Sequence, residues 1–316
     1  MLKKLILVIV LAALGWSAFW YWQAQALRSE IDRAVVQARA EGWQIAYEDL
    51  GIRGFPNRLD VTLQAVDVTS PDGGLRWQAP FFQVFQLTYK PGHVIAVWPD
   101  AHAVTVDGIR YAVDGAGQRA SLVFTAAGRI LRANAEAQSL TVAPEDASPV
   151  TLDQPRAALE VLEGDELAYR LAAGAASLGT TGQETPATDL RLDLTAHLDA
   201  PLRIDQRRPP RPNRFEIRTI RQTLDPMTVQ INGDVDVDGS GRLDGALDLR
   251  AEDWRAYLDT QGADGGGPEE AVRGLLEMVS LVSGGGDTLD LTLRFDDGQM
   301  SVGLIPLGPA PRLRLP

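Results

Sequence analysis

Residues 5–22 form an unbroken apolar run, LILVIVLAALGWSAFWYW, that directly follows Lys3 and Lys4. At about 1.5 Å per residue, a helix of this length spans about 27 Å and nearly crosses the roughly 30 Å hydrocarbon core of a bilayer. Aromatic residues gather at the C-terminal end of the run, and such rings favour the headgroup region. We expect residues 1–26 to comprise a cytoplasmic tip and a transmembrane anchor, with interfacial aromatic residues at Trp16, Trp20, Tyr21 and Trp22.

The charges that flank the run predict its orientation. Because Lys3 and Lys4 precede it, the positive-inside rule keeps the N-terminus in the cytoplasm and exports residues 27–316. A signal peptide cleaved after Ala26 is the alternative, since Ala24 and Ala26 form a small-x-small site, but the run exceeds the about 7–15 apolar residues typical of signal peptides. No second run approaches this length. We expect a single-pass protein of the bacterial inner membrane whose C-terminal region lies in the periplasm.

The composition excludes several classes of function. The chain has no cysteine, which removes thiolate catalysis, disulfide bonds and cysteine metal sites. Its net charge of −12 disfavours binding to nucleic acid. The histidines His93, His102 and His197 lack metal-ligand spacing, and the known catalytic and phosphate-binding signatures are missing from the sequence. We therefore predict no metal site, no cofactor and no enzymatic activity. A hydrolase that uses a pair of carboxylates is the remaining enzymatic alternative.

The spacing of apolar residues changes from helical to alternating at Gly42. Before it, one helical face carries Leu27, Ile31, Val35 and Ala38, which predicts a helix over residues 24–42 that packs on the first sheet. After it, apolar and polar residues alternate in many short segments separated by glycine- and proline-rich turns. We predict a β-rich α+β fold: an N-terminal transmembrane helix, then large, mostly antiparallel curved sheets with a few covering helices.

Two halves are expected in the exported part. Weak stretches around residues 143–156 and 179–189 can each separate them. We place an N-terminal β-rich half at residues 27–175 and a C-terminal β-rich half at residues 188–316. The C-terminal half also carries two apolar stripes at helical spacing, which predict helices over residues 251–262 and 268–282.

Residues 203–221 invert the charge of the chain locally, with seven arginines against Asp205 and Glu216. Guanidinium groups bind phosphate well, so this proline-rich segment is a candidate site for anionic lipid headgroups or for a protein partner. We assign the candidate site to Arg207, Arg208, Arg211 and Arg214. The alternative is a solvated loop that pairs with acidic strands of its own fold.

A shorter acidic pattern, Asp234-Val-Asp236-Val-Asp238-Gly239, is similar to the start of a calcium-binding loop. Position 12 of such a loop needs a glutamate, but here it is Gly245, and strand patterns flank the segment instead of helices. We interpret the aspartates as the exposed face of a strand followed by a turn.

The chain carries four recognisable segments: GFPNRLD from Gly54, APFFQ from Ala79, YKPGHVIAVWP from Tyr89 and LGPAP from Leu307. These resemble a bacterial domain-of-unknown-function family, family 2125, of membrane-anchored exported proteins. The resemblance implies no catalytic residue, cofactor or assigned activity. We expect structural roles for its motif residues, with Phe55 buried where Pro56 introduces a strand; these residues are Gly54, Phe55, Pro56, Lys90, Pro91, His93, Trp98 and Pro99.

A further segment, Asn232–Trp254, is more weakly similar to the C-terminal part of AsmA-like envelope proteins, which are implicated in envelope assembly and lipid traffic. With the anchor and the strand pattern, this similarity predicts a non-enzymatic protein of cell-envelope biogenesis that handles lipid or assists outer-membrane assembly. The expected partners are the inner membrane through residues 5–22, a phospholipid or glycolipid, and an envelope protein.

A periplasmic scaffold that binds a protein partner is the alternative function. Sheet geometry separates these hypotheses. A continuous apolar trough favours lipid handling, and closed, fully packed sheets favour a scaffold. A polar cleft with two carboxylates about 5–9 Å apart favours a hydrolase.

Overall fold

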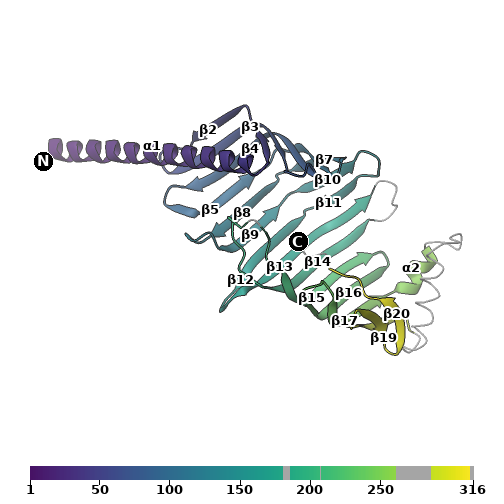
Figure 1. Ribbon diagram of the computed structural model, residues 1–316. Helices are drawn as coiled ribbons and strands as arrows, with labels where there is room; N and C mark the ends of the chain where they lie inside the picture. Colours follow the sequence, from purple (N-terminus) through teal and green to yellow (C-terminus); the bar gives the residue numbers. More distant parts are fainter. Residues whose placement is uncertain (181–185, 207, 261–285, 314–316) are drawn as a thin grey trace. The chain divides into compact units, whose positions relative to one another are not determined.

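Figure 1 shows the computed structural model of the chain, which describes residues 1–180, 186–206, 208–260 and 286–313. The chain divides into two compact units: unit 1 contains residues 1–124 and 135–150, and unit 2 contains residues 125–134 and 151–316. The prediction of a β-rich chain with a long apolar N-terminal helix and antiparallel sheet is confirmed.

Unit 1 contains one long helix and the strands of one antiparallel network. Its elements are α1 (Leu2–Ala40), β1 (Gln44–Ala46), β2 (Asp49–Arg53), β3 (Arg58–Thr69), β4 (Leu75–Leu87), β5 (Lys90–Val97), β6 (Ala101–Val106), β7 (Ile109–Ala116), β8 (Arg119–Phe124) and β10 (Ser139–Pro144). β3 pairs with β1, β2 and β4. β5 continues to β8, while β6 continues to β7 and β10.

A proline marks the point where β4 changes partner. The segment Leu75–Gln78 pairs with β6, and the segment Gln83–Leu87 pairs with β5. Pro80 lies between these segments and has no N–H to donate to a strand ladder. The network of unit 1 therefore forks at β4, and the two branches leave from opposite ends of the same strand.

The helix α1 contains the whole apolar run. Among the described residues it is the one helix long and apolar enough to cross a membrane, and none of its most apolar 18-residue window is buried. In its second half, the four residues of the predicted stripe are half-buried, while most of their neighbours are exposed. Gly42, at φ 97°, follows the helix as predicted. The Trp43 amide donates a hydrogen bond to the carbonyl of Ala38.

Two arginines join α1 to the strands that follow it. Arg28 donates to the carbonyl of Leu50 in β2, and Arg39 donates to the carbonyl of Ile45 in β1. Ala24, on the same side of the helix, is only 8% exposed. The C-terminal half of α1 is therefore part of unit 1 and not a free stalk.

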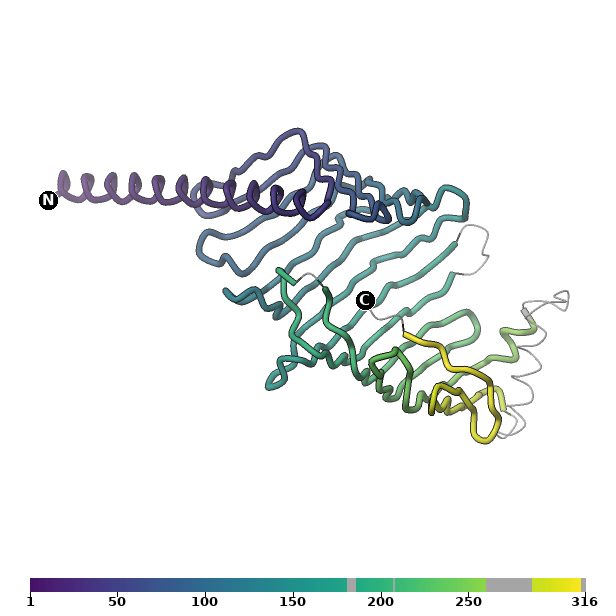
Figure 2. Tube along the Cα trace, in the orientation of Figure 1, coloured from purple at the N-terminus to yellow at the C-terminus, as the bar shows by residue number. Residues whose placement is uncertain are grey.

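Unit 2 is a meander of antiparallel strands. Its elements are β12 (Arg156–Leu162), β13 (Asp165–Thr180), β14 (Ala187–Leu198), β15 (Pro212–Leu224), β16 (Met227–Val237), β17 (Leu243–Glu252), α2 (Trp254–Thr260), β18 (Thr288–Asp296), β19 (Gln299–Val302) and β20 (Ile305–Pro309). Each strand from β13 onward pairs with the strand before it, as the trace in Figure 2 shows. Two further strands, β9 (Ile130–Glu136) and β11 (Val150–Asp153), cross the division between the units.

The predicted segments of the C-terminal half fall as follows. The expected division between residues 175 and 188 lies within unit 2, where residues 175 and 188 belong to the paired strands β13 and β14. α2 lies inside the helix predicted over residues 251–262. The helix predicted over residues 268–282 lies outside the described residues.

Candidate functional site

One face of the unit 2 sheet is apolar across successive strands. The strand registers place apolar residues opposite one another from β14 to β18, in the row Leu192, Ile220, Ile231, Leu249 and Leu291. A parallel row from β12 to β16 contains Val161, Tyr169, Ala196, Phe215 and Val235. Because alternate residues of a strand share a face, these rows belong to one surface, which we call the apolar face.

The two ends of the apolar face are covered by neighbouring segments. At one end α2 places Trp254, which is 1% exposed, against a cluster that includes Leu249 and Leu291. At the other end Leu202 packs with Tyr169 and Phe215, and the Leu202 amide donates to the Tyr169 hydroxyl at 3.0 Å.

The middle of the apolar face is less buried than its ends. Leu192, Ile220 and Ile231, which belong to neither covered cluster, are half-buried. In the described part of unit 2, the extensive packing is between neighbouring strands, and α2 is the one helix placed on the sheet. Among the described residues of unit 2, no second layer covers the middle of the apolar face, which differs from a closed, fully packed sandwich.

Unit 1 carries a row of the same kind. Ile52, Val61, Val84, Ala96 and Ala120 lie opposite one another across β2, β3, β4, β5 and β8. An aromatic group lies elsewhere on β4 and just after β5, where the Phe82 ring is 5.5 Å from both the Trp77 and Trp98 rings. Continuous apolar rows are therefore a property of each unit.

The opposite face of the unit 2 sheet is charged. Arg170 binds Asp193 at 2.6 Å and Arg218 approaches the same carboxylate at 3.7 Å. The hydrogen bond from Arg170 lowers the pKa of Asp193, and the charges of both arginines act in the same direction. Arg250 binds Asp290 at 3.3 Å. The charged side chains of this face form ion pairs with one another and are partly exposed to solvent. The unit 2 sheet therefore has one charged face and one apolar face.

The arginine-rich segment is largely paired with its own fold. Arg214 lies 3.3 Å from Asp236, 3.4 Å from Glu216 and 3.8 Å from Asp234, and these carboxylates raise its pKa. Three more of the seven arginines bind aspartates in the pairs Arg203–Asp205, Arg218–Asp193 and Arg221–Asp189. The pairing with acidic strands that the sequence left as an alternative thus describes Arg214, Arg218 and Arg221, whereas Arg203 pairs within its own loop.

The other members of the candidate arginine site differ from Arg214. Arg208 and Arg211 are exposed, and neither forms an ion pair within the described residues. The Arg211 backbone amide donates to Asp199 at 2.8 Å. Arg207 lies outside the described residues. Within the described residues, Arg208 and Arg211 therefore differ from Arg214, which is paired with three carboxylates.

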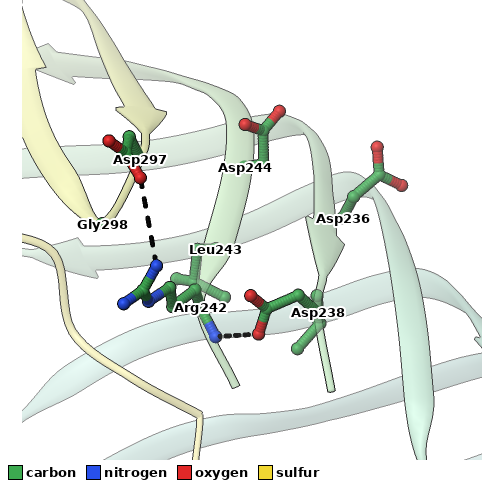
Figure 3. A pocket seen from close by; sticks show the side chains of 8 residues that line it. Asp236, Asp238, Arg242, Leu243, Asp244, Asp297 and Gly298 are labelled. Atoms are coloured by element: carbon green, nitrogen blue, oxygen red, sulfur yellow. Dashed lines mark hydrogen bonds and ion pairs between the residues drawn. The ribbon is translucent and has the colours of Figure 1, made fainter. Parts of the chain in front are cut away.

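The acidic pattern on β16 borders a pocket of about 340 Å³. Figure 3 shows its aspartates and Arg242, which lies 3.9 Å from Asp297. The Asp238 carboxylate accepts hydrogen bonds from the Ser240 hydroxyl and amide and from the Arg242 amide, and these lower its pKa. The bonds hold the β16–β17 turn. In the described part of the chain, no group of three or more acidic or histidine side chains is placed to hold a metal ion.

Two of the three histidines take part in separate polar contacts. His197 lies 3.2 Å from Glu216, and His102 belongs to a larger network. The Trp77 indole donates to Nδ1 of His102 at 3.3 Å, and Nε2 of His102 lies 3.2 Å from the Gln118 side chain. Gln118 in turn donates to the Pro99 carbonyl, and the Trp98 amide donates to the Gln118 carbonyl. This part of the family motif therefore takes part in a hydrogen-bonded network that joins β4, β6 and the turn before β8.

A second part of the family motif contacts α1. Gly54, at φ 104°, has no room for a side chain, because a Cβ would lie 2.9 Å from the Arg58 carbonyl. The Trp16 indole donates to the Pro56 carbonyl at 2.9 Å. The Phe55 ring is 5.7 Å from the Trp20 ring in an edge-on contact and is 54% exposed, so the expectation that Phe55 is buried was wrong. Its partner is α1, a contact that alternation along a strand does not reveal.

The rest of the motif lies around the start of β5. Lys90 is exposed, the Pro91 carbonyl accepts a hydrogen bond from the Gln86 side chain, and His93 lies opposite Val123 of β8. The aromatic residues Tyr21 and Trp22 of α1 are exposed, at 62% and 65%.

Comparison with known proteins identifies a family and no characterised relative. A family described as "Uncharacterized protein conserved in bacteria (DUF2125)" matches residues 20–311. No curated protein and no solved structure matches the chain significantly. The weaker similarity of Asn232–Trp254 to AsmA-like proteins stays a prediction.

Proposed function

Since the chain belongs to the DUF2125 family over residues 20–311, we propose that it is a membrane-anchored, non-enzymatic protein of the cell envelope that binds lipid acyl chains on its apolar face. The observation that carries the proposal is the half-buried row of apolar residues from Leu192 to Leu291. Contiguous apolar surface that stays partly exposed to water is typical of binding sites, which supports the proposal.

The dimensions of the row suit an acyl chain. Five strands at about 4.8 Å spacing make the row about 19 Å wide, which exceeds the roughly 15 Å that one leaflet contributes to a bilayer core. At most about a third of each side chain in the row remains exposed, so covering it is worth about 0.5–1 kcal/mol. Leu249 and Leu291 already pack against the cluster under α2, so the other three residues contribute roughly 2–3 kcal/mol to the binding of a chain. The charged opposite face keeps the same sheet soluble.

The proposal includes an orientation for the anchor. Because Lys3 and Lys4 precede the apolar run, the positive-inside rule favours an N-terminus in the cytoplasm and both units in the periplasm. Proteinase added to cells with a permeable outer membrane is expected to digest the two units. Full protection until the inner membrane is broken rejects this orientation.

Photo-crosslinking in intact membranes tests lipid binding on the full chain. A photoreactive phenylalanine analogue replaces Ile231, which belongs to the apolar row, or Asn232, which is adjacent and exposed on the opposite face. Mass spectrometry is expected to find a phospholipid or glycolipid adduct at residue 231 and none at residue 232. A protein adduct at residue 231 supports a scaffold instead. Lipid adducts of equal yield at both positions contradict a specific face.

A further inference from the structure

The turn between β2 and β3 is attached to α1 inside the apolar run. The indole of Trp16 donates to the Pro56 carbonyl at 2.9 Å, and the indole of Trp20 donates to the Arg58 carbonyl at 2.7 Å. The Phe55 ring lies edge-on to the Trp20 ring. These contacts fix the height of the turn along the membrane helix.

That height is too low for the turn to lie clear of a bilayer. Trp16 is twelve residues beyond Lys4, so about 18 Å of apolar helix lies between them. The hydrocarbon core needs about 30 Å, and tilting the helix only shortens the distance it spans. If the turn lay wholly in water, the anchor would be short of the core by about 12 Å. Snorkelling of Lys3 and Lys4 and local thinning of the bilayer make up part of this deficit, and the turn then lies at the interface and not clear of it.

The β4–β5 turn lies beside it. The amide and hydroxyl of Thr88 both donate to the Asn57 carbonyl, at 3.0 and 3.1 Å. We call the two turns together, residues 53–58 and 88–91, the membrane tip. Phe55 and Tyr89 expose 54% and 63% of their surface there.

The charge of the membrane tip matches an anionic surface. In a chain of net charge −12, these ten residues contain Arg53, Arg58 and Lys90 and no acidic residue. Arg58 binds the nearby Asp60 at 2.6 Å, whereas Arg53 and Lys90 are exposed. Exposed aromatic rings with adjacent cations are the side chains that suit the headgroup layer.

We infer that the membrane tip is a second membrane-contact site, in which Phe55 and Tyr89 insert into the headgroup layer of the leaflet from which α1 emerges. Arg53 and Lys90 face the phosphates of anionic phospholipids. The inference rests on α1 crossing the bilayer and is independent of lipid binding on the apolar face. It makes unit 1 a body held at the membrane by two points, the anchor and the tip.

Spin-label depth measurement tests the inference on the full chain. The chain has no cysteine, so Phe55→Cys, Tyr89→Cys and Ile109→Cys each give one labelling site. Ile109 is the matched control, because it is similarly exposed, at 48%, but lies away from the tip. It is at the start of β7, and β7 pairs with β6, which pairs with the end of β4 that is farther from the β4–β5 turn. Labelled protein is reconstituted in phosphatidylcholine vesicles with or without phosphatidylglycerol, and flotation first establishes anchoring.

The expected result is a several-fold higher ratio of oxygen to nickel-chelate accessibility at residues 55 and 89 than at residue 109. The inference is overturned if the labels at residues 55 and 89 are as accessible to the nickel chelate as the label at residue 109. Because flotation has already shown that the protein is anchored, this result would reject the tip contact and not the anchor. Tyr89→Cys covers the case in which Phe55→Cys disturbs the turn. The label at residue 89 is expected to lie deeper in vesicles with phosphatidylglycerol than in vesicles without it. The double substitution Arg53→Ser and Lys90→Ser is expected to remove this difference in depth.

If the label lies equally deep in both vesicle types, the role of Arg53 and Lys90 in binding anionic phospholipid is overturned.

Discussion

Tyr169→Phe removes a single hydrogen bond from the cover over one end of the apolar face. Tyr169 is 0% exposed, and its hydroxyl accepts the hydrogen bond from the Leu202 amide at 3.0 Å. The substitution keeps the ring and its apolar contacts. A lost hydrogen bond costs about 1 kcal/mol, and an amide left without a partner in a half-buried position brings the cost to about 1–2 kcal/mol.

This magnitude predicts a local change in hydrogen exchange. A cost of about 1–2 kcal/mol corresponds to a roughly 5- to 30-fold larger open population. Mass spectrometry of the peptide that contains Leu202 is expected to show faster amide exchange by that factor in Tyr169→Phe. Tyr89→Phe is the control, because the side chain of Tyr89 is 63% exposed. Unchanged exchange near Leu202 in Tyr169→Phe, or the same acceleration in Tyr89→Phe, refutes the reasoning.

Three further substitutions probe unit 2. Trp254→Ala empties the core beneath α2 and is expected to lower the free energy of unfolding by about 3–5 kcal/mol, measured by proteolysis in increasing urea. Gly233→Ala is expected to cost more than about 1 kcal/mol in the same assay, because a Cβ there would lie 2.3 Å from a carbonyl of β17, whereas Gly51→Ala meets nothing within 4 Å and is the control. Because Arg170 lowers the pKa of Asp193, the stability from this pair is complete above the unfolded pKa of about 3.9 and is lost as the pH falls through the lower folded value. Asp193→Asn is expected to flatten the dependence of stability on acidic pH, and an unchanged pH profile contradicts this role.

Local patterns in the sequence predict the elements of the fold well. The stripe from Leu27 to Ala38 follows from helical periodicity, and the structure half-buries all four of its residues. Alternation also predicts which residues of β16 share a face, since Ile231 and Val235 lie on the apolar face while Asp234 and Asp236 are exposed. These features depend on neighbours in the sequence, so a single chain suffices to find them.

Contacts between distant segments are not visible in such patterns. Arg214 appears in the sequence as part of a cationic loop, but the register of β15 and β16 places it opposite Asp236. Phe55 is apolar and precedes a strand, but its ring packs on Trp20 of α1, 35 residues earlier. Both results depend on which segments meet, which periodicity does not determine.

The meander of unit 2 bears on how the chain acquires its structure. From β13 to β20, each strand pairs with the one before it. A chain made from its N-terminus onward therefore completes each strand pair as soon as the next strand is available, without waiting for a distant segment. Growth by one hairpin at a time places each new strand at the edge that the previous strand left unpaired. Gain or loss of a hairpin in evolution would widen or narrow the apolar face by about 10 Å and leave the other strand pairs intact.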